Sequence, residues 1–359
     1  MPPDTARVLA QQGNVERLQE RLGAEWPSIS AARENAGATI QRLLPRLRPI
    51  VRPDTTVVVF GSLARLELTA GSDVDWTLLV DGFADPLHWD DARRIEGRLR
   101  EEKLRPPTSG GAFGSVTFSH DLIHRIGGED DTNHNTTQRL LLLLESVPIG
   151  ESSAYNRVLE RVLERYVEED LIGSNDTPYR VPRFLQNDIA RYWRTMAVDF
   201  AHKRRVRGDG WALRTAKLRM SRKLIYAAGL LSCYSCDFGF PAARQARSLS
   251  SAYEAVLNHL GQLVRTTPLD IMAGAVLLYF GKFSGAAAEL FAAYDAFLAL
   301  LNDKEWRTRM KNLSPQSADT DEDYQDVRKL GNRFQDALTE MFLIRKTPLR
   351  DLTMRYGVF

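Results

Sequence analysis

The chain has 359 residues, of which 43% are apolar and 26% are charged; these values are ordinary for a globular protein, and the length predicts about two domains. Because 48 Lys and Arg residues nearly balance 46 Asp and Glu residues, the net charge of +2 favours neither nucleic acid nor a membrane as a partner of the whole chain. Two cysteines exclude a disulfide-stabilised scaffold. The first residues lack an apolar stretch of signal-peptide length, and the longest apolar runs, 273–280 and 296–301, are too short to span a membrane, so we expect a cytoplasmic protein with no membrane partner.

The first half of the chain mixes predicted helices and strands. Apolar spacing and strong helix formers predict helices over residues 6–49, with a break near Trp26. The β-branched run Thr55–Phe60 has the composition of a buried strand, and Val74–Val80 is a second candidate strand. Pro86–Leu104 predicts an amphipathic helix rich in Arg and Glu.

A third strand is expected over Ser115–Ile126, which lies between two glycine-rich stretches. A short helix is expected to continue through Leu140–Glu145, with Thr136 or Thr137 as its N-cap. Three strands with flanking helices predict a small α/β core at this end of the chain.

From about residue 151 the strand signals vanish and helical spacing takes over. Linkers that contain Gly, Pro, Ser and Asp separate the predicted helices, which are Tyr155–Leu171, Arg183–Arg205, Trp211–Leu230, Ala242–Val264, Pro268–Gly281, Gly285–Leu301 and Asp323–Ile344. We therefore predict an α+β protein with a mixed domain over residues 1–150 and an all-helical domain over residues 151–359.

The segment between the first two strands carries the most informative residues. The first strand leads directly into Gly61 and Ser62, where the absence of a Cβ lets the backbone approach a ligand and the serine hydroxyl can contact an anion such as phosphate. Ten residues later come Asp73 and Asp75, at the start of the second strand. Since a strand has a period of two, both carboxylates should share one face, while Val74 and Trp76 pack into the core from the other.

Two carboxylates beside a phosphate cradle form a donor set that suits Mg²⁺ bound to a nucleoside triphosphate such as ATP. Mg²⁺ takes hard oxygen ligands, with one or two carboxylates per ion and phosphate oxygens or water in the remaining positions. Two such ions, for which Mn²⁺ is the alternative, would activate an attacking oxygen and stabilise a leaving pyrophosphate. The competing interpretation is a β-turn-β unit whose two aspartates only solvate the end of a strand.

Gly61 and Ser62, followed after ten residues by Asp73 and Asp75, resemble the signature of the DNA polymerase β-like nucleotidyltransferase superfamily. The flanking residues agree, with a strand before Gly61, Ala-Arg just after Ser62, and an apolar strand after Asp75. The resemblance implies a polymerase β-like core in which Asp73 and Asp75 bind the metal and act in catalysis. It also implies that Gly61 and Ser62 hold the β- and γ-phosphates of the nucleotide.

Members of that superfamily usually carry a third carboxylate on a later strand. Alternation along Ser115–Ile126 would place Asp121 on one face with Thr117, which makes Asp121 our candidate for the base or third ligand. The alternatives are Glu129, Asp130 and Asp131 in the following loop, or no third carboxylate. His120 and His124 would share a face of the same strand but would lie about 13 Å apart, too far for one ion.

A looser similarity covers residues 55–230. The helical second half, the segment Thr136–Gly150 and the segment Gly210–Leu218 are similar to the group that contains glutamine-synthetase adenylyltransferases and PII uridylyltransferases. The chain departs from that group, because it has no second catalytic half, no HD phosphohydrolase pattern and no evident regulatory domain. The acceptor therefore cannot be transferred from those enzymes.

Basic residues gather between His202 and Lys223. On a helix that starts near Trp211, Arg214 and Lys217 form one stripe with Ser221, whereas a second face collects the cations Arg219, Arg222 and Lys223. The first stripe, together with Arg65, is a candidate for contacts to the triphosphate. Alternatively, the basic faces follow the backbone of an RNA acceptor, or they are solvated and pair with acidic helices.

The expected activity is that of a nucleotidyltransferase. An acceptor hydroxyl attacks the α-phosphorus of a nucleoside triphosphate, and pyrophosphate is released. The acceptor is a protein side chain, an RNA or tRNA end, or a small molecule such as an aminoglycoside. The alternative class is a non-catalytic protein whose degenerate core binds a nucleotide or a partner without turnover.

Overall fold

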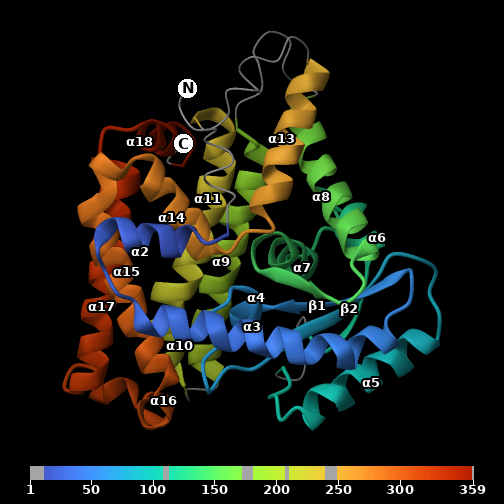
Figure 1. Ribbon diagram of the computed structural model, residues 1–359, viewed down its shortest axis with the longest axis horizontal. Helices are drawn as coiled ribbons and strands as arrows, with labels where there is room; N and C mark the ends of the chain where they lie inside the picture. The colour runs from blue at the N-terminus through green and yellow to red at the C-terminus, as the bar shows by residue number, and fades with distance from the viewer. Residues whose placement is uncertain (1–11, 108–112, 172–180, 207–209, 239–248, 358–359) are drawn as a thin grey trace. The chain divides into compact units, whose positions relative to one another are not determined.

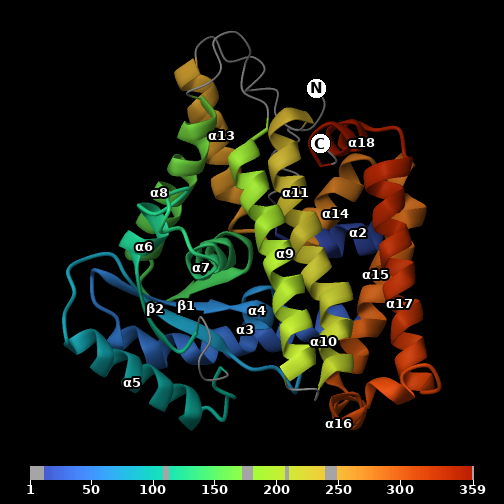
Figure 2. The ribbon, with the colours of Figure 1, turned by 180° about the vertical axis from the view of Figure 1, so that it is seen from behind.

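The computed structural model describes residues 12–107, 113–171, 181–206, 210–238 and 249–357. The chain divides into two compact units (Figures 1 and 2). We call Ala32–Ile172 the sheet unit, and Met1–Ala31 together with Gly173–Phe359 the helical unit. A small sheet combined with many helices confirms the predicted α+β class. These units have other bounds than the expected domains, 1–150 and 151–359, and that division of the sequence stays a prediction.

The sheet unit contains a four-stranded mixed sheet with the order β3-β2-β1-β4. Its strands are β1 (Thr55–Phe60), β2 (Asp75–Val80), β3 (Ser115–Phe118) and β4 (Ser146–Ile149). β1 pairs antiparallel with both β2 and β4, whereas β2 and β3 run parallel. All six residues of β1 are buried, as expected for a central strand made of β-branched residues.

Each face of this sheet is covered by helices, which are α3 (Pro27–Leu47), α5 (Leu87–Glu101), α6 (Ser119–Ile123), α7 (Asn133–Leu144) and α8 (Ser153–Leu171). Alternate residues of β1 and β2 share one hydrophobic cluster with side chains of α3 and α5, among them Val57, Val59, Val74, Trp76, Leu78, Val80, Leu43, Leu47, Ile95 and Leu99. The expected alternation is confirmed on this face. α7 covers the opposite face (Figure 1), and α8 contacts β1 and β2.

The expected third strand over Ser115–Ile126 is wrong beyond Phe118. There the chain turns into α6, where Leu122, Ile123 and Ile126 are buried, a spacing that suits one side of a helix. The expected N-cap of the next helix is also wrong, because Thr132 caps α7 by accepting a hydrogen bond from the backbone N–H of Asn135 at 3.2 Å.

The helical unit is built from a series of helices that the spacing predicted in large part. They are α2 (Asn14–Leu22), α9 (Arg183–Val206), α10 (Trp211–Lys217), α11 (Lys223–Phe238), α13 (Leu249–Leu263), α14 (Pro268–Leu278), α15 (Phe280–Asn302), α16 (Lys304–Asn312), α17 (Glu322–Thr339) and α18 (Pro348–Leu352). The π-turn η2 (Leu218–Arg222) joins α10 to α11, and the π-turn η4 (Glu340–Ile344) extends α17. The residues 6–11 and 242–248 of the expected helices lie outside the described residues.

The two sequence segments that make up this unit meet where α2 packs against α14. The carboxylate of Asp270 accepts a hydrogen bond from the backbone N–H of Val15 at 3.1 Å, and the side-chain amide of Asn14 donates to the backbone carbonyl of Asp270. Asp270 is fully buried and its carboxylate also contacts the hydroxyl of Thr267, which caps α14. One carboxylate therefore serves the starts of two helices.

Among the described residues, α15 is the one helix long and apolar enough to cross a membrane, and half of its most apolar window is buried in the protein. Within the helical unit Phe291 of this helix stacks on Trp26, and Tyr294 contacts Phe334 of α17. Core helices of many proteins have the same length and composition, so this finding is weak evidence for a membrane span.

A buried histidine predicts how the stability of the helical unit responds to acid. The Nε2 of His259 on α13 lies 2.7 Å from the hydroxyl of Ser235 on α11, and burial lowers the pKa of His259 from 6.5 to about 4. The folded protein therefore keeps the ring neutral at a pH at which the unfolded chain binds a proton. The stabilising contribution is complete above pH 6.5 and is lost as the pH falls towards 4.

Accordingly, between pH 7 and pH 4 the free energy of unfolding should fall by about 3 kcal/mol more in the wild type than in His259→Gln. Urea titrations at several pH values measure this difference, and the same replacement at the exposed His134 controls for the loss of a histidine. Parallel pH profiles for the wild type and His259→Gln would contradict the assignment.

Candidate functional site

The antiparallel register of β1 and β2 brings the two halves of the sequence motif together. The pairing ends with Phe60 opposite Asp75, so the Asp75 side chain lies on the face of Phe60 and next to Gly61. Phe60 is the last residue of β1, and the short helix α4 (Gly61–Ala64) begins immediately after it. The close approach of Gly61 and Asp75 therefore follows from strand pairing alone.

Gly61 is needed here for two reasons. Its φ is +66°, a left-handed conformation that glycine adopts without a steric penalty. In addition, a Cβ at this position would lie 3.1 Å from the Oδ2 of Asp75. The carboxylate of Asp75 thus points at the space that the missing side chain leaves open, and the neighbouring Ser62 is half-buried.

Asp73 and Asp75 both stay out of the hydrophobic cluster. Asp73 is exposed and Asp75 half-buried, whereas the residues between and after them, Val74 and Trp76, are 1% exposed. The backbone around Asp73 is held by a bridge to Arg105, whose carbonyl accepts a hydrogen bond from the Val74 N–H at 2.9 Å. Two carboxylates, one residue apart, therefore face away from the core at one end of β2.

The loop between these parts is held by its own hydrogen bonds. The backbone N–H of Glu67 donates to the carbonyl of Ser62 at 2.7 Å, and Leu66 adopts a φ of +58°. Nearer to Asp73, the hydroxyl of Ser72 accepts a hydrogen bond from the Thr69 N–H at 3.2 Å, which closes a turn. These contacts fix the ends of the loop beside Gly61 and beside Asp73.

Arg65 is buried beneath this loop in a network with two carboxylates. Its Nε donates to Glu67 at 2.9 Å, and its Nη1 forms an ion pair with Glu145, which directly precedes β4. All three side chains are less than 10% exposed. In this arrangement Arg65 supports the loop. The direct contact between Arg65 and phosphate that we expect from the sequence stays a prediction.

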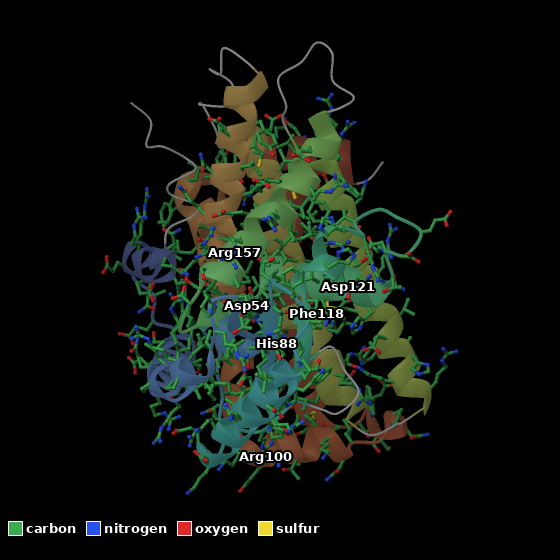
Figure 3. All side chains as sticks on the ribbon, turned by 90° about the vertical axis from the view of Figure 1, so that its right-hand side faces the viewer. Asp54, His88, Arg100, Phe118, Asp121 and Arg157 are labelled. Atoms are coloured by element: carbon green, nitrogen blue, oxygen red, sulfur yellow. The ribbon has the colours of Figure 1, made fainter. Side chains whose placement is uncertain are left out.

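Asp121 lies on α6 and not on a strand, one turn after Phe118 (Figure 3). Its carboxylate forms an ion pair with Arg125 at 3.0 Å, and both side chains are 42% exposed. The distance expected between His120 and His124 is wrong for the same reason, because on a helix their ring centres are 4.9 Å apart. The large distance expected on a strand was the reason for excluding this histidine pair as metal ligands, and that reason does not hold on a helix.

No third ligand joins the aspartate pair within the described ranges, where no group of three or more His, Cys, Asp or Glu side chains is arranged around a common metal position. Of the alternatives to Asp121, Glu129 and Asp130 are exposed, whereas the buried Asp131 pairs with Arg139 through both carboxylate oxygens at 3.1 and 2.8 Å. Next to the aspartate pair, the chain before β3 approaches β2 through a hydrogen bond from the Gly114 N–H to the Trp76 carbonyl.

Arg214 and Lys217 are both half-buried on α10, in the helical unit. The expected stripe does not continue to Ser221, which is buried on the π-turn η2.

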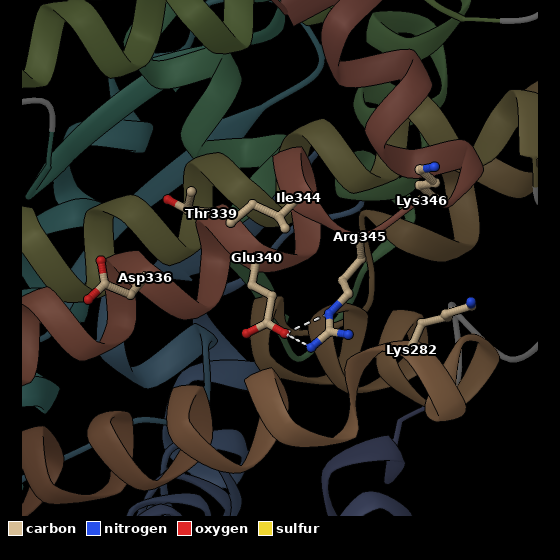
Figure 4. A pocket seen from close by; sticks show the side chains of 7 residues that line it. All are labelled: Lys282, Asp336, Thr339, Glu340, Ile344, Arg345 and Lys346. Carbon is tan, nitrogen blue, oxygen red and sulfur yellow. Dashed lines mark hydrogen bonds and ion pairs between the residues drawn. The ribbon is translucent and has the colours of Figure 1, made fainter.

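The helical unit also contains a hollow of about 630 Å³ (Figure 4) that no sequence signal indicated. Charged residues dominate its lining, which consists of Lys282, Asp336, Thr339, Glu340, Ile344, Arg345 and Lys346, with Glu340 and Arg345 paired to each other.

No protein-family model matches the chain, and no curated protein matches it at a significant level.

The conformation of Gly61 predicts opposite effects of two Gly→Ala substitutions. Gly61→Ala should lower the free energy of unfolding by about 1–2 kcal/mol, because alanine is strained at a φ of +66° and its Cβ meets Asp75. Gly37→Ala is the matched control: Gly37 lies inside α3 with nothing within 4 Å of its Cβ position, so alanine should stabilise the helix. Chemical denaturation measures both, and an unchanged stability of Gly61→Ala would contradict the described turn.

The buried network predicts that the loss of Arg65 is costly. Arg65→Met leaves Glu67 and Glu145 buried without their cation and should lower the free energy of unfolding by about 3–5 kcal/mol. The triple variant Arg65→Met, Glu67→Gln, Glu145→Gln should recover most of this loss, since it buries no uncompensated charge. Arg93→Met removes an exposed ion pair to Asp90 and should cost less than about 1 kcal/mol, and equal losses for Arg65→Met and Arg93→Met would contradict the burial of the network.

Proposed function

We propose that the sheet unit is a polymerase β-like nucleotidyltransferase core that moves a nucleoside monophosphate from a nucleoside triphosphate to an acceptor hydroxyl. The observation that carries this proposal is the approach of the Asp75 carboxylate to the open side of Gly61, at the point where β1 and β2 end their pairing. This approach brings together the two parts of the sequence motif, Gly61-Ser62 and the aspartate pair, which are separated by ten residues in the sequence.

The donor set fits a hard divalent cation. Asp73 and Asp75 offer oxygen ligands outside the core, and the missing Cβ of Gly61 lets the Asp75 carboxylate lie close to the backbone of Gly61. Mg²⁺ commonly binds proteins through one or two carboxylates and completes its shell with water and phosphate oxygens, so the two aspartates suffice as protein ligands. When bound, the ion neutralises developing charge on the reacting oxygens.

In the proposed reaction the oxygen of the acceptor hydroxyl forms a bond to the α-phosphorus, and the bond from that phosphorus to the oxygen bridging to the β-phosphorus breaks. Pyrophosphate leaves with the electron pair of that bond, and the hydroxyl proton passes to a base. Gly61 allows the triphosphate to approach the backbone, and the Ser62 hydroxyl donates to a β- or γ-phosphate oxygen. The electrostatic support comes from positioned groups, as in other phosphoryl transfers.

Asp121 remains the proposed base, from the exposed surface of α6, and Arg214 and Lys217 remain proposed contacts of the triphosphate. The acceptor is a protein or the end of an RNA, with a small molecule as the further alternative.

Transfer of label tests the proposal. The full-length protein is incubated with Mg²⁺ and each α-³²P-labelled triphosphate, with cell lysate, total RNA or no addition. We expect label in one acceptor class, and we expect Asp73→Asn and Asp75→Asn each to reduce the transfer at least 100-fold, because each removes a ligand of the cation.

Asp54→Asn is the matched control, because Asp54 precedes β1 at the end opposite Gly61 and lies near His88 (Figure 3). It should leave the transfer within about twofold, as expected for a change outside the reacting site. Transfer that survives the loss of both Asp73 and Asp75 would refute the assignment of the metal ligands. Nucleotide binding without transfer in any mixture would favour a non-catalytic core instead.

A further inference from the structure

Two cations lie against α17 in the helical unit, Arg219 on the π-turn η2 and Lys223 at the first residue of α11. Arg219 donates from Nη2 to the Oδ1 of Asn332 at 2.5 Å, and Lys223 donates from Nζ to the Oε1 of Gln335 at 2.5 Å. The guanidinium of Arg219 lies over Gly331, where a Cβ would come within 3.0 Å of its Nε. Both side chains are half-buried, so the two charges are held in place and partly removed from water.

The partners of this pair are neutral. Within the described part of the chain, neither Arg219 nor Lys223 forms an ion pair with a carboxylate. On α17, Asp323 pairs with Arg309, Asp326 pairs with Lys329, and Asp336 lines the hollow described above. Burial, and then the charge of Arg219, lower the pKa of Lys223. Two like charges are thus placed together without compensation, an arrangement that costs stability and commonly marks a functional site.

The turn that carries Arg219 and leads directly into Lys223 is of an uncommon kind. π-turns are rare inside α-helices and often occur at functional sites. Arg222, on the same turn, points to the other neighbouring helix, where its Nη1 contacts the Sδ of Met196 on α9 at 3.6 Å. Between Arg191 and Lys223 the sequence contains two acids, Asp199 and Asp209, so the surroundings of the turn are strongly basic. An anion bound there would be attracted by more than the two cations that contact it.

We propose that Arg219 and Lys223 form a binding site for a phosphate group where η2 meets α11, with Asn332 and Gln335 as polar neighbours that release the cations to the ligand. An arginine fork and a lysine point charge together suit phosphate oxygens. The phosphate belongs either to a free polyphosphate chain, as in a nucleotide, or to the backbone of RNA. This site lies in the helical unit and does not depend on the proposed nucleotidyl transfer.

Thermal unfolding in the presence of EDTA tests the site without divalent cations and hence without turnover. The probes are tripolyphosphate and a ten-nucleotide single-stranded RNA, each compared with sodium chloride at equal ionic strength. We expect at least one probe to raise the melting temperature of the wild type. Arg219→Gln and Lys223→Gln should each weaken the binding of that probe at least tenfold.

Lys329→Gln is the matched control, because it makes the same charge change on α17 at a lysine that is exposed and already paired with Asp326. It should leave the response to the probes unchanged. A second signature concerns the protein without ligand: Lys223→Gln should be as stable as the wild type or more stable, since it removes a charge held beside Arg219. A merely structural lysine would instead lower the melting temperature when replaced.

The two probes distinguish the sources of the phosphate. Tighter binding of tripolyphosphate indicates a free polyphosphate chain, whereas tighter binding of RNA, with a smaller salt dependence in Lys223→Gln, indicates a nucleic-acid backbone. The proposal is overturned if neither probe stabilises the wild type, or if the response is the same in Lys223→Gln. A variant with Asp73→Asn and Asp75→Asn should keep the response, so failure of the nucleotidyltransferase proposal leaves this result interpretable.

Discussion

The pairing of β1 with β2 is the constraint on which the candidate site depends. Antiparallel strands put directly opposed side chains on the same face, and this register ends with Phe60 opposite Asp75. A slip of one residue would move Asp75 to the hydrophobic face and bring Val74 out, so the burial of Val74, Trp76, Leu78 and Val80 protects the register. Core packing and site geometry are therefore one and the same requirement in this unit.

The support beneath the site is polar and buried. Arg65 links the loop after β1 to Glu145, which directly precedes β4, while Glu67 provides its second carboxylate. Such a network resists partial disruption, because every member left without its partner is a buried charge. These contacts hold Gly61 and Ser62 in one conformation, and a binding site benefits from that, because less freedom is lost when a ligand arrives.

The sequence was sufficient for the features that depend on local periodicity. The strands 55–60 and 75–80 and most helices are where alternation and helical spacing predicted them. The strand prediction failed after Phe118 because the sequence there fits both a strand and a helix. Its apolar residues alternate loosely, as in a strand, yet the spacing of Leu122, Ile123 and Ile126 also suits a helix. Nothing local predicted the ion pair between Arg65 and Glu145, which are 80 residues apart. Nor did a local pattern predict the π-turn from which Arg219 contacts α17 and Arg222 contacts α9.

The contact of α2 with α14 has a consequence for synthesis on the ribosome. The two helices are about 255 positions apart, and at roughly 5–20 residues per second α2 emerges about 13–50 s before α14. During that interval Val15 and Leu18, buried in the finished protein, have no partner on α14, while the whole sheet unit is translated. The buried side of α2 therefore lacks this partner for that time, and the helical unit can be completed only after its second sequence segment has been translated.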